Sequence, residues 1–406
     1  MSPSSEPALA FTPQERMASM GLASVIGLRM LGLFLMLPVL AIGAGGLTGG
    51  GSPVWLGLAM GAYGLTQAVL QIPFGVASDR WGRRPVILAG LGIFVTGSLV
   101  CALSSSIEML VIGRALQGAG AVSAAVSAYL ADLTRESVRT RAMAMVGAAI
   151  GLSFALSMVI APPLFGVWGL TGLFAFTAGL AVMAMLVVLR LPTPAQRPPE
   201  GRLPWAVLLG HDQLKRLNLG IFTMMAIQTS LFVAIPQVLV SLDLSISDHW
   251  QVYLPLMLLA FALMVPPILW AERKGRFKPV FLASIGLLIL AMALFLTANP
   301  FWSWMLAIAI FMLGFNLLEA LLPSWVSRLA PSGQRGQAMG VYNTSQSLGL
   351  FVGGAAGGLA LAQAGLDGVF WLCGGLALFW GMMSLGLHEI GPRSRPVVPE
   401  AQPIEG

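Results

Sequence analysis

The chain has 406 residues, of which 57% are hydrophobic and 9% are charged, and its mean hydropathy is +0.85. Soluble domains carry about 25% charged residues, so this composition excludes an ordinary soluble protein and indicates an integral membrane protein. The net charge is +6, but the basic residues lie in short loops between apolar runs. Loops that face anionic lipid have this character, so we discount nucleic acid as a partner.

Apolar runs long enough to cross a bilayer, about 20 residues each, follow one another along almost the whole chain. A helix start precedes the first run, with Thr12 as the cap and Glu15 reaching back to it, and it predicts a short surface helix. The runs predict an all-α fold with 12 transmembrane helices at residues 19–43, 54–76, 86–106, 109–131, 142–166, 169–191, 217–241, 249–270, 279–298, 301–324, 336–361 and 367–388.

The basic residues predict the orientation of these spans. Of the 22 lysines and arginines, all but Arg29 and Arg114 lie in the N-terminal arm, in the loops after even-numbered spans, or in the tail. The opposite loops, such as residues 44–53, 167–169 and 297–300, carry none. Because positive loops stay in the cytoplasm, both termini of this multi-pass protein are expected there.

The longest polar interval, rich in proline and arginine, separates the spans into six and six and is expected to be a linker. The tail is polar and rich in proline, and we expect it to be disordered. The predicted organisation is a cytoplasmic arm at residues 1–18, a six-helix bundle at 19–191, a cytoplasmic linker at 192–216, a second six-helix bundle at 217–388 and a tail at 389–406.

A weak internal repeat relates the two halves. Residues 272–276 (ERKGR) align with residues 79–83 (DRWGR) at an offset of 193 positions, and residues 335–339 repeat the R-x-x-A-M pattern of 139–143 at an offset of 196. Both matches place the same element at equivalent positions of the two halves. The repeat therefore predicts two pseudo-symmetric bundles.

A charged hinge, Gly75-Val-Ala-Ser-Asp-Arg-Trp-Gly-Arg-Arg84, joins the second and third spans. Glycine allows close helix approach and a tight turn, an aspartate accepts hydrogen bonds at a helix start, and the arginines can pair with a carboxylate or with lipid phosphate. The pattern G-x-x-x-D-R-x-G-R-R resembles the corresponding loop of major facilitator superfamily transporters, and an ordinary positive-inside turn is the alternative. The residues assigned to this cytoplasmic gate are Gly75, Asp79, Arg80, Gly82, Arg83 and Arg84.

The resemblance implies further gate contacts. It makes Asp132, at the end of the fourth span, the partner of the hinge arginines, and it places Asp79 near residues 332–334 at the start of the eleventh helix. The second copy of the hinge has Ile268 in place of Gly75 and Phe277 in place of Arg84. We therefore expect an asymmetric gate.

Three ionisable residues lie well inside spans, where such groups are costly and face a cavity or a partner by default. Arg29 has either a substrate or coupling role or a structural role as a hydrogen-bond donor. Glu319, on one helical face with Asn316, is the first candidate for a proton-binding group, because burial couples a carboxylate's protonation to its surroundings. A permanent ion pair, for example with Arg29, is the alternative.

The third of these residues, Arg114, opens the pattern Arg114-x-x-Gln117-Gly-x-Gly-Ala121. This pattern resembles the fourth-helix motif of proton-coupled members of the superfamily, which implies a part in proton transfer for Arg114 and Gln117. A packing motif with one satisfied arginine is the alternative. In the fifth span, the G-P-x-x-G-G pattern of drug–proton antiporters is replaced by A-P-P-L-F-G at residues 161–166, which leaves symport and uniport open.

Uncharged polar residues at helical spacing predict the lining of a substrate cavity, although some will only bond neighbouring helices. They are Tyr63, Gln67, Gln71, Gln228, Gln237, Asn343 and Gln346. The histidines show no metal-ligand spacing and no nucleophile partner, so we expect no enzyme, no metal site and no cofactor.

The resemblance covers the whole chain and is of the drug–proton antiporter-like type. It implies a multi-pass protein of a bacterial inner membrane. It includes a group of bacterial transporters with a soluble domain after the twelfth helix, and we do not expect this chain to hold such a domain. We expect a monomer in membrane lipid that exports a small amphipathic organic compound in exchange for protons. A metabolite symporter or uniporter is the first alternative, and a receptor or assembly factor that transports nothing is the second.

Overall fold

The computed structural model describes residues 10–192, 210–297, 301–330 and 335–389. These residues form long helices joined by short connections, as expected where the bilayer offers the backbone no other hydrogen-bond partner. The elements are α1 (Pro13–Phe34), α2 (Leu40–Gly43), η1 (Ala44–Gly46), α3 (Pro53–Trp81), α4 (Arg83–Ala102), α5 (Ile107–Ala119), α6 (Ser123–Leu133), α7 (Glu136–Arg190), α9 (Asp212–Ser241), η2 (Ile246–Asp248), α10 (Trp250–Lys274), α11 (Phe277–Thr297), α12 (Phe301–Leu329) and α13 (Arg335–Ser384).

Two of these helices each contain two spans. α7 bends at Gly169 (φ 61°, ψ −168°) and α13 bends at Gly365 (φ 65°, ψ −156°), a backbone conformation that is essentially restricted to glycine. The two bends are 196 positions apart, which is the offset of the R-x-x-A-M repeat. Together with α5 and α6, which form one span, they give the predicted 12 transmembrane helices in two pseudo-symmetric six-helix bundles.

The structure corrects three details of the predicted helices. The cap at Thr12 and Glu15 starts α1 itself, so the separate surface helix is wrong. The first span is interrupted between Phe34 and Leu40, around Pro38, and the fourth is interrupted between α5 and α6. A proline cannot continue a helical hydrogen-bond ladder, which explains the first break.

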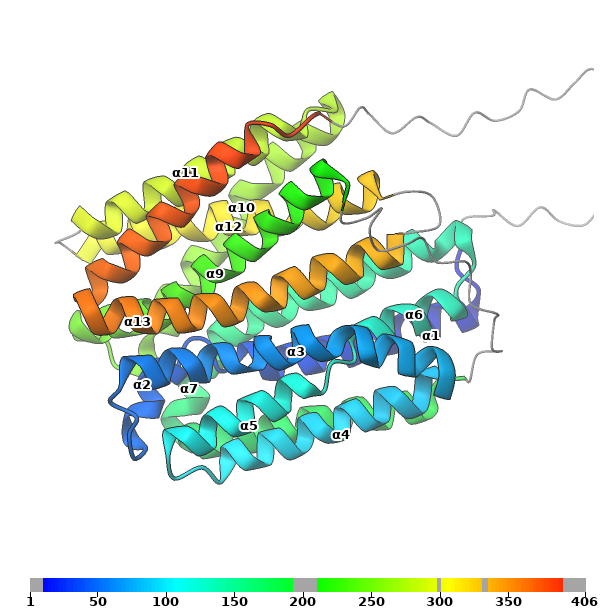
Figure 1. Ribbon diagram of the computed structural model, residues 1–406, viewed down its shortest axis with the longest axis horizontal. Helices are drawn as coiled ribbons and strands as arrows, with labels where there is room; N and C mark the ends of the chain where they lie inside the picture. Colours follow the sequence, from blue (N-terminus) through cyan, green and yellow to red (C-terminus); the bar gives the residue numbers. More distant parts are fainter. Residues whose placement is uncertain (1–9, 193–209, 298–300, 331–334, 390–406) are drawn as a thin grey trace, which may run out of the picture.

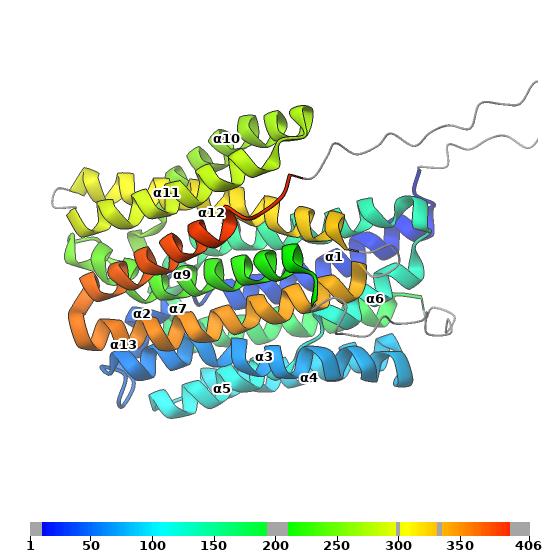
Figure 2. The same ribbon diagram turned by 45° about the horizontal axis from the view of Figure 1, so that its top comes forward.

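The N-terminal half (α1 to α7) and the C-terminal half (α9 to α13) meet along α3 and α13, which run side by side in both views (Figures 1 and 2). α4 and α5 form the outer edge of the first half, and α10 and α11 form the outer edge of the second. The turns α3–α4 and α10–α11 lie at the same end of the molecule, which we call the basic end (Figure 1). The turn α4–α5 lies at the opposite end, the far end.

The halves are packed tightly together toward the far end. A Cβ atom on Gly57 of α3 would lie 2.2 Å from the carbonyl oxygen of Gly354 in α13, and one on Gly61 would lie 2.7 Å from that of Phe351. Toward the basic end, a Cβ atom on Gly147 of α7 or on Gly340 of α13 would meet no atom within 4 Å. The halves are therefore closed against each other at the far end, while these two glycines near the basic end face open space.

Candidate functional site

Arg29 is fully buried in α1 and is held by polar side chains of two other helices. Its guanidinium donates to Tyr63 Oη at 2.7 Å, to Gln67 Oε1 at 3.1 Å and to Ser123 Oγ at 3.0 Å. Ser123 is the first residue of α6, so the break in the fourth span brings its hydroxyl to this site. No acidic side chain within the described ranges pairs with Arg29.

A polar connection runs from this arginine into the other half of the protein. Gln67 accepts from Arg29 through its oxygen and donates through its amide nitrogen to Ser347 Oγ of α13 at 2.9 Å. Ser347 in turn donates to the carbonyl oxygen of Asn343 at 2.9 Å. Gln67, a predicted cavity residue, thus links Arg29 to Ser347 across the interface between the halves, and Asn343 takes part only through its backbone carbonyl.

Arg114 and Gln117 lie together, as their spacing predicted. Arg114 donates to Gln117 Oε1 at 2.8 Å and to the carbonyl oxygen of Ala59 at 3.2 Å, and Gln117 donates to Ser98 Oγ at 2.8 Å. The guanidinium carbon of Arg114 lies 5.4 Å from the ring centroid of Tyr63, and that of Arg29 lies 5.8 Å from it. One tyrosine ring is therefore in cation–π range of two buried cations.

Glycine is required next to this site because α5 crosses α3 closely. A Cβ atom on Gly118 would lie 2.0 Å from the carbonyl oxygen of Tyr63, and one on Gly120 would lie 2.4 Å from that of Gly90. The glycines of the fourth-helix motif thus allow α5 to approach α3 and α4. This contact holds Arg114 against Tyr63.

Glu319 lies in α12, in the C-terminal half, and is not paired with Arg29. Its Oε2 atom is buried and has no hydrogen-bond partner, and the same holds for the side-chain nitrogen of Asn316. The hydroxyl of Tyr342 in α13 is also buried without a partner, and Tyr342 is within electrostatic range of Glu319. Glu319 makes no ion pair with a residue in the described ranges. This state therefore lacks the ion pair with Arg29 that was the alternative interpretation of Glu319.

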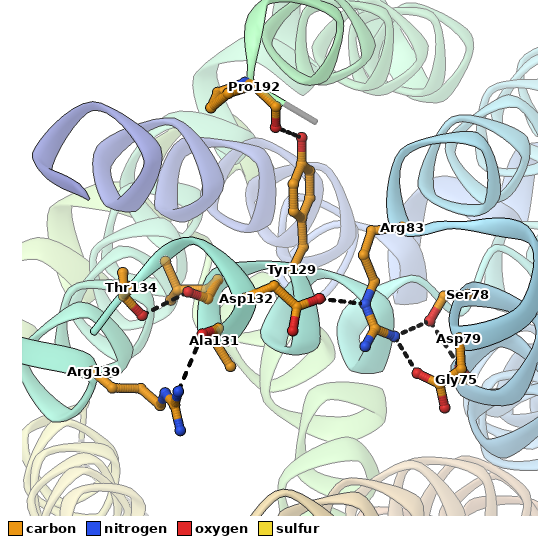
Figure 3. A network of polar contacts seen from close by, with 11 residues as sticks. Gly75, Ser78, Asp79, Arg83, Tyr129, Ala131, Asp132, Thr134, Arg139 and Pro192 are labelled. Atoms are coloured by element: carbon orange, nitrogen blue, oxygen red, sulfur yellow. Dashed lines mark hydrogen bonds and ion pairs between the residues drawn. The ribbon is translucent and has the colours of Figure 1, made fainter. Parts of the chain in front are cut away.

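The N-terminal hinge is held by one arginine between two carboxylates (Figure 3). Arg83 Nε donates to Asp132 Oδ2 at 2.8 Å, and its Nη1 contacts Asp79 Oδ1 and donates to Ser78 Oγ at 2.8 Å. Ser78 donates back to the carbonyl oxygen of Gly75 at 2.8 Å. The three charged side chains are 17–25% exposed, so the cluster is only partly screened by water.

The remaining hinge residues are placed differently. Arg84 donates to the carbonyl oxygen of Leu189 at 2.5 Å, at the end of α7, and Arg80 is exposed. Gly82 has φ +92°, as a tight turn requires. The contact expected between Asp79 and residues 332–334 lies outside the described residues.

The C-terminal hinge keeps the turn, and Arg276, which aligns with Arg83, forms no ion pair with a residue in the described ranges. Gly275, aligned with Gly82, has φ +63°. Arg328 lies 196 positions after Asp132, and its guanidinium carbon is 4.3 Å from the ring centroid of Phe277, the residue in the place of Arg84. A cation–π contact thus joins the hinge to the end of α12, where the N-terminal half has an arginine–aspartate pair.

The other predicted cavity residues have separate environments. Gln71 is 1% exposed and neither polar atom of its amide has a partner. Gln237 donates to the carbonyl oxygen of Val233 in its own helix, and Gln346 donates to the sulfur of Met225 at 3.7 Å. Gln228 is buried in α9. Their role as a substrate lining remains a prediction.

The sequence did not predict the contacts of three serines or one ion pair. Ser98, Ser123 and Ser347 complete the arginine networks, but serines are common in membrane helices and carry no distinctive signal. Glu15 forms a two-point ion pair with Arg135, at 2.8 and 2.9 Å, which fastens the start of α1 to the loop before α7. The predicted capping role of Glu15 was a partial signal for this contact.

No group of three or more metal-ligating side chains occurs within the part of the chain that the structure describes. A cavity of about 290 Å³ lies between α10, α11 and α12 and is not lined by Arg29, Arg114 or Glu319. The buried polar residues described above can therefore offer hydrogen bonds and charge to a ligand within the membrane-embedded core.

Comparison with known proteins agrees with this geometry. The family model "Major Facilitator Superfamily" matches residues 17–353 and 256–405. The inner membrane transport protein YajR of Escherichia coli is 44% identical over 385 residues, which are 93% of this chain and 85% of that protein. The multidrug resistance protein MdtH of Aeromonas hydrophila is 26% identical over 84% of this chain and 87% of its own length.

A solved structure gives the same fold. The crystal structure of a D-xylose-proton symporter superposes with a TM-score of 0.75 at 15% identity, over 91% of this chain and 98% of the symporter. The relatives are transporters rather than enzymes. The chain belongs to the major facilitator superfamily and is a membrane transporter of the type that includes YajR and MdtH.

Proposed function

We propose that this transporter exports a small amphipathic organic compound in exchange for protons, with Glu319 as the proton-binding residue. The observation that carries the proposal is the buried, unpartnered Oε2 atom of Glu319 in the middle of α12. An ionised carboxylate without a counter-ion is costly in such a place, so the group favours a proton or a ligand.

The neighbours of Glu319 support this role. Asn316 and Tyr342 each present an unpartnered polar atom in the same region of α12 and α13. A protonated carboxyl group can both donate and accept hydrogen bonds, whereas an ionised one only accepts. Loss of the proton therefore changes which of these bonds can form, and this links protonation to the packing of α12 against α13.

The N-terminal half supplies the opposite charge. Arg29 and Arg114 are buried without an acidic partner in the described ranges, and both lie in cation–π range of Tyr63. Two uncompensated cations favour an anionic or electron-rich ligand group and disfavour a proton on nearby acids. The Gln67–Ser347 bond connects this charge to the half that contains Glu319.

The close packing of α3 against α13 toward the far end supports a state of alternating access that is closed at that end. The basic end is the cytoplasmic one if the positive loops stay inside, so this state faces the cytoplasm. The arginine between Asp79 and Asp132 holds the hinge after α3 to the end of α6 in this state. Rearrangement of such a cluster is a suitable bistable step for the opposite state.

Symport or uniport of a metabolite is the second candidate. The sequence A-P-P-L-F-G at residues 161–166 departs from the antiporter pattern, and the solved structure above is a symporter. The similarity to MdtH, a multidrug resistance protein, favours export instead.

Proteoliposomes with an imposed pH gradient and a trapped pH-sensitive dye test the proposal. A panel of amphipathic organic cations and anions is added, and at least one should accelerate proton movement through the wild-type protein. Glu319→Gln should abolish this acceleration and keep the folded state, as judged by thermal unfolding. Glu108→Gln, an exposed acid in the first turn of α5, is the matched control and should behave as wild type.

Coupled flux that survives Glu319→Gln would refute the assignment of the proton site. Substrate uptake into the vesicles without any proton movement would support uniport. A protein that moves neither protons nor compounds would support a receptor or assembly factor.

A further inference from the structure

A lipid-facing groove opens on the outer edge of the C-terminal half. Its volume is about 290 Å³, and it lies between Pro267 of α10, Pro279, Ala283 and Leu287 of α11, and Leu313 and Leu317 of α12. α11 is at the outer edge of the molecule in both views (Figures 1 and 2), and Pro279 and Ala283 are exposed. The groove is therefore open to the membrane rather than to the interface between the halves.

The groove has the dimensions of an acyl-chain site in one leaflet. From Pro279 to Leu287 it follows α11 for about 12 Å at 1.5 Å per residue, and one leaflet contributes about half of a 30 Å hydrocarbon core. Its lining is almost entirely apolar, because Ser284 uses its hydroxyl to bond the carbonyl oxygen of Val280 in its own helix. An apolar chain would fill it without leaving a polar group unsatisfied.

A cationic cluster lies at the basic-end mouth of this groove. Arg273, Lys274 and Arg276 belong to the turn between α10 and α11, directly before Pro279, and all three are exposed. None of them forms an ion pair with a residue in the described ranges. Glu272 is the one acid within this turn, so the turn carries a net positive charge.

We propose that the groove and this turn together bind an anionic phospholipid, with one acyl chain along α11 and the phosphate at Arg273, Lys274 and Arg276. Charge complementarity identifies the occupant, since apolar surface alone would accept any lipid. Lysine and arginine at the membrane surface attract anionic headgroups.

The comparison of the two hinges gives this lipid a structural role. In the N-terminal half, Arg83 has Asp79 and Asp132 as partners. In the C-terminal half, the position of Asp132 is taken by Arg328, and the aligned Arg276 is exposed. Within the described ranges no acidic side chain pairs with Arg276, and the phosphate of a lipid supplies a negative partner for it.

Native mass spectrometry of the purified full-length protein tests the site. The protein is mixed with phosphatidylglycerol or with phosphatidylcholine of the same acyl chains, and the wild type should retain phosphatidylglycerol preferentially. Arg276→Gln should lower phosphatidylglycerol retention about fivefold, since one surface cation contributes about 1 kcal/mol to attraction, and should leave phosphatidylcholine retention unchanged. Ala283→Trp fills the groove and should lower retention of both lipids.

Two matched variants separate this site from general lipid attraction. Arg190→Gln removes an exposed arginine at the end of α7, and Leu290→Trp places a tryptophan on an exposed position farther along α11. Both should retain lipid as the wild type does, and thermal unfolding confirms that every variant is folded. Equal losses in Arg190→Gln and Arg276→Gln, or no loss in Ala283→Trp, would overturn the proposal.

Discussion

The two hinges of this transporter are equivalent in position and different in chemistry. After α3, Arg83 lies between Asp79 and Asp132. Water or a polar group of a neighbouring helix can replace either carboxylate as the partner of Arg83. After α10, Arg328 lies over the ring of Phe277, and Phe277 is 5% exposed. A partly exposed ion-pair cluster rearranges at lower cost than a buried ring, so the N-terminal hinge is the better candidate for the moving part of the gate.

The difference also shows which part of a degraded repeat is retained. The turn itself is retained, because Gly82 and Gly275 both have positive φ. The contact that joins the hinge to a neighbouring helix differs. It is an arginine–aspartate pair with α6 in the N-terminal half and a cation–π contact with α12 in the C-terminal half. Arg273, Lys274 and Arg276 of the C-terminal hinge are exposed and form no ion pair within the described ranges.

The largest effect should come from truncating the buried ring. Phe277→Ala removes a buried aromatic side chain and its contact with Arg328, and it should lower the free energy of unfolding by about 3 kcal/mol. Arg84→Ala, the aligned change in the N-terminal half, removes one bond to a backbone carbonyl and should cost about 1 kcal/mol. Denaturant unfolding in detergent measures both, and equal losses would contradict the contrast between the hinges.

The two turn glycines should differ less. Gly82 has φ +92° and ψ +152°, a region nearly closed to other residues, and Gly82→Ala should cost about 2 kcal/mol. Gly275 has φ +63° and ψ +23°, the left-handed helical region, so Gly275→Ala should cost about 1 kcal/mol. Gly275→Asn should recover part of that loss, because asparagine tolerates this region better than alanine. Thermal unfolding of the three variants gives the order of their stabilities. A larger loss of stability in Gly275→Ala than in Gly82→Ala would refute the predicted order.

The last contrast in stability concerns the arginines aligned at the two hinges. Arg83→Gln leaves Asp79 and Asp132 without their shared cation and should cost about 1 to 2 kcal/mol, less than for a fully buried pair because the cluster is partly exposed. Arg276→Gln removes an exposed side chain and should change stability by less than about 0.5 kcal/mol in lipid-free detergent. The same unfolding assay in detergent with added phosphatidylglycerol should increase the effect of Arg276→Gln alone.

Much of the fold followed from local patterns. Twelve apolar runs predicted the spans, because a bilayer sets their length, and the shared offsets predicted two related bundles. The breaks in the first and fourth spans were missed. In the fourth span the signal was present as Gly118 and Gly120, but only the backbone of α3 and α4 shows why the helix is interrupted there.

The site was predictable in part for a similar reason. Arg29, Arg114 and Glu319 were found because charge inside a span is rare and needs an explanation. The partners Ser123 and Ser347 were not, because a hydroxyl is cheap in a membrane helix and its partner lies far away in the sequence. The separation of Glu319 from Arg29 likewise depends on the packing of two halves, which no spacing along the chain encodes.

The central claim is that the two halves rock about the buried polar core. Distances between spin labels at both ends of the molecule test this claim most directly. One pair of cysteines replaces the exposed Trp81 and Lys274 at the basic end, and a second pair replaces the exposed Leu103 and Trp302 at the far end, with the buried native cysteines Cys101 and Cys373 replaced by serine. Electron–electron double resonance then compares the protein as such with its Glu319→Gln form, which mimics the protonated carboxyl group. The account predicts that the Glu319→Gln form shortens the basic-end distance and lengthens the far-end distance. Distances that stay constant, or that change in the same direction at both ends, would contradict it.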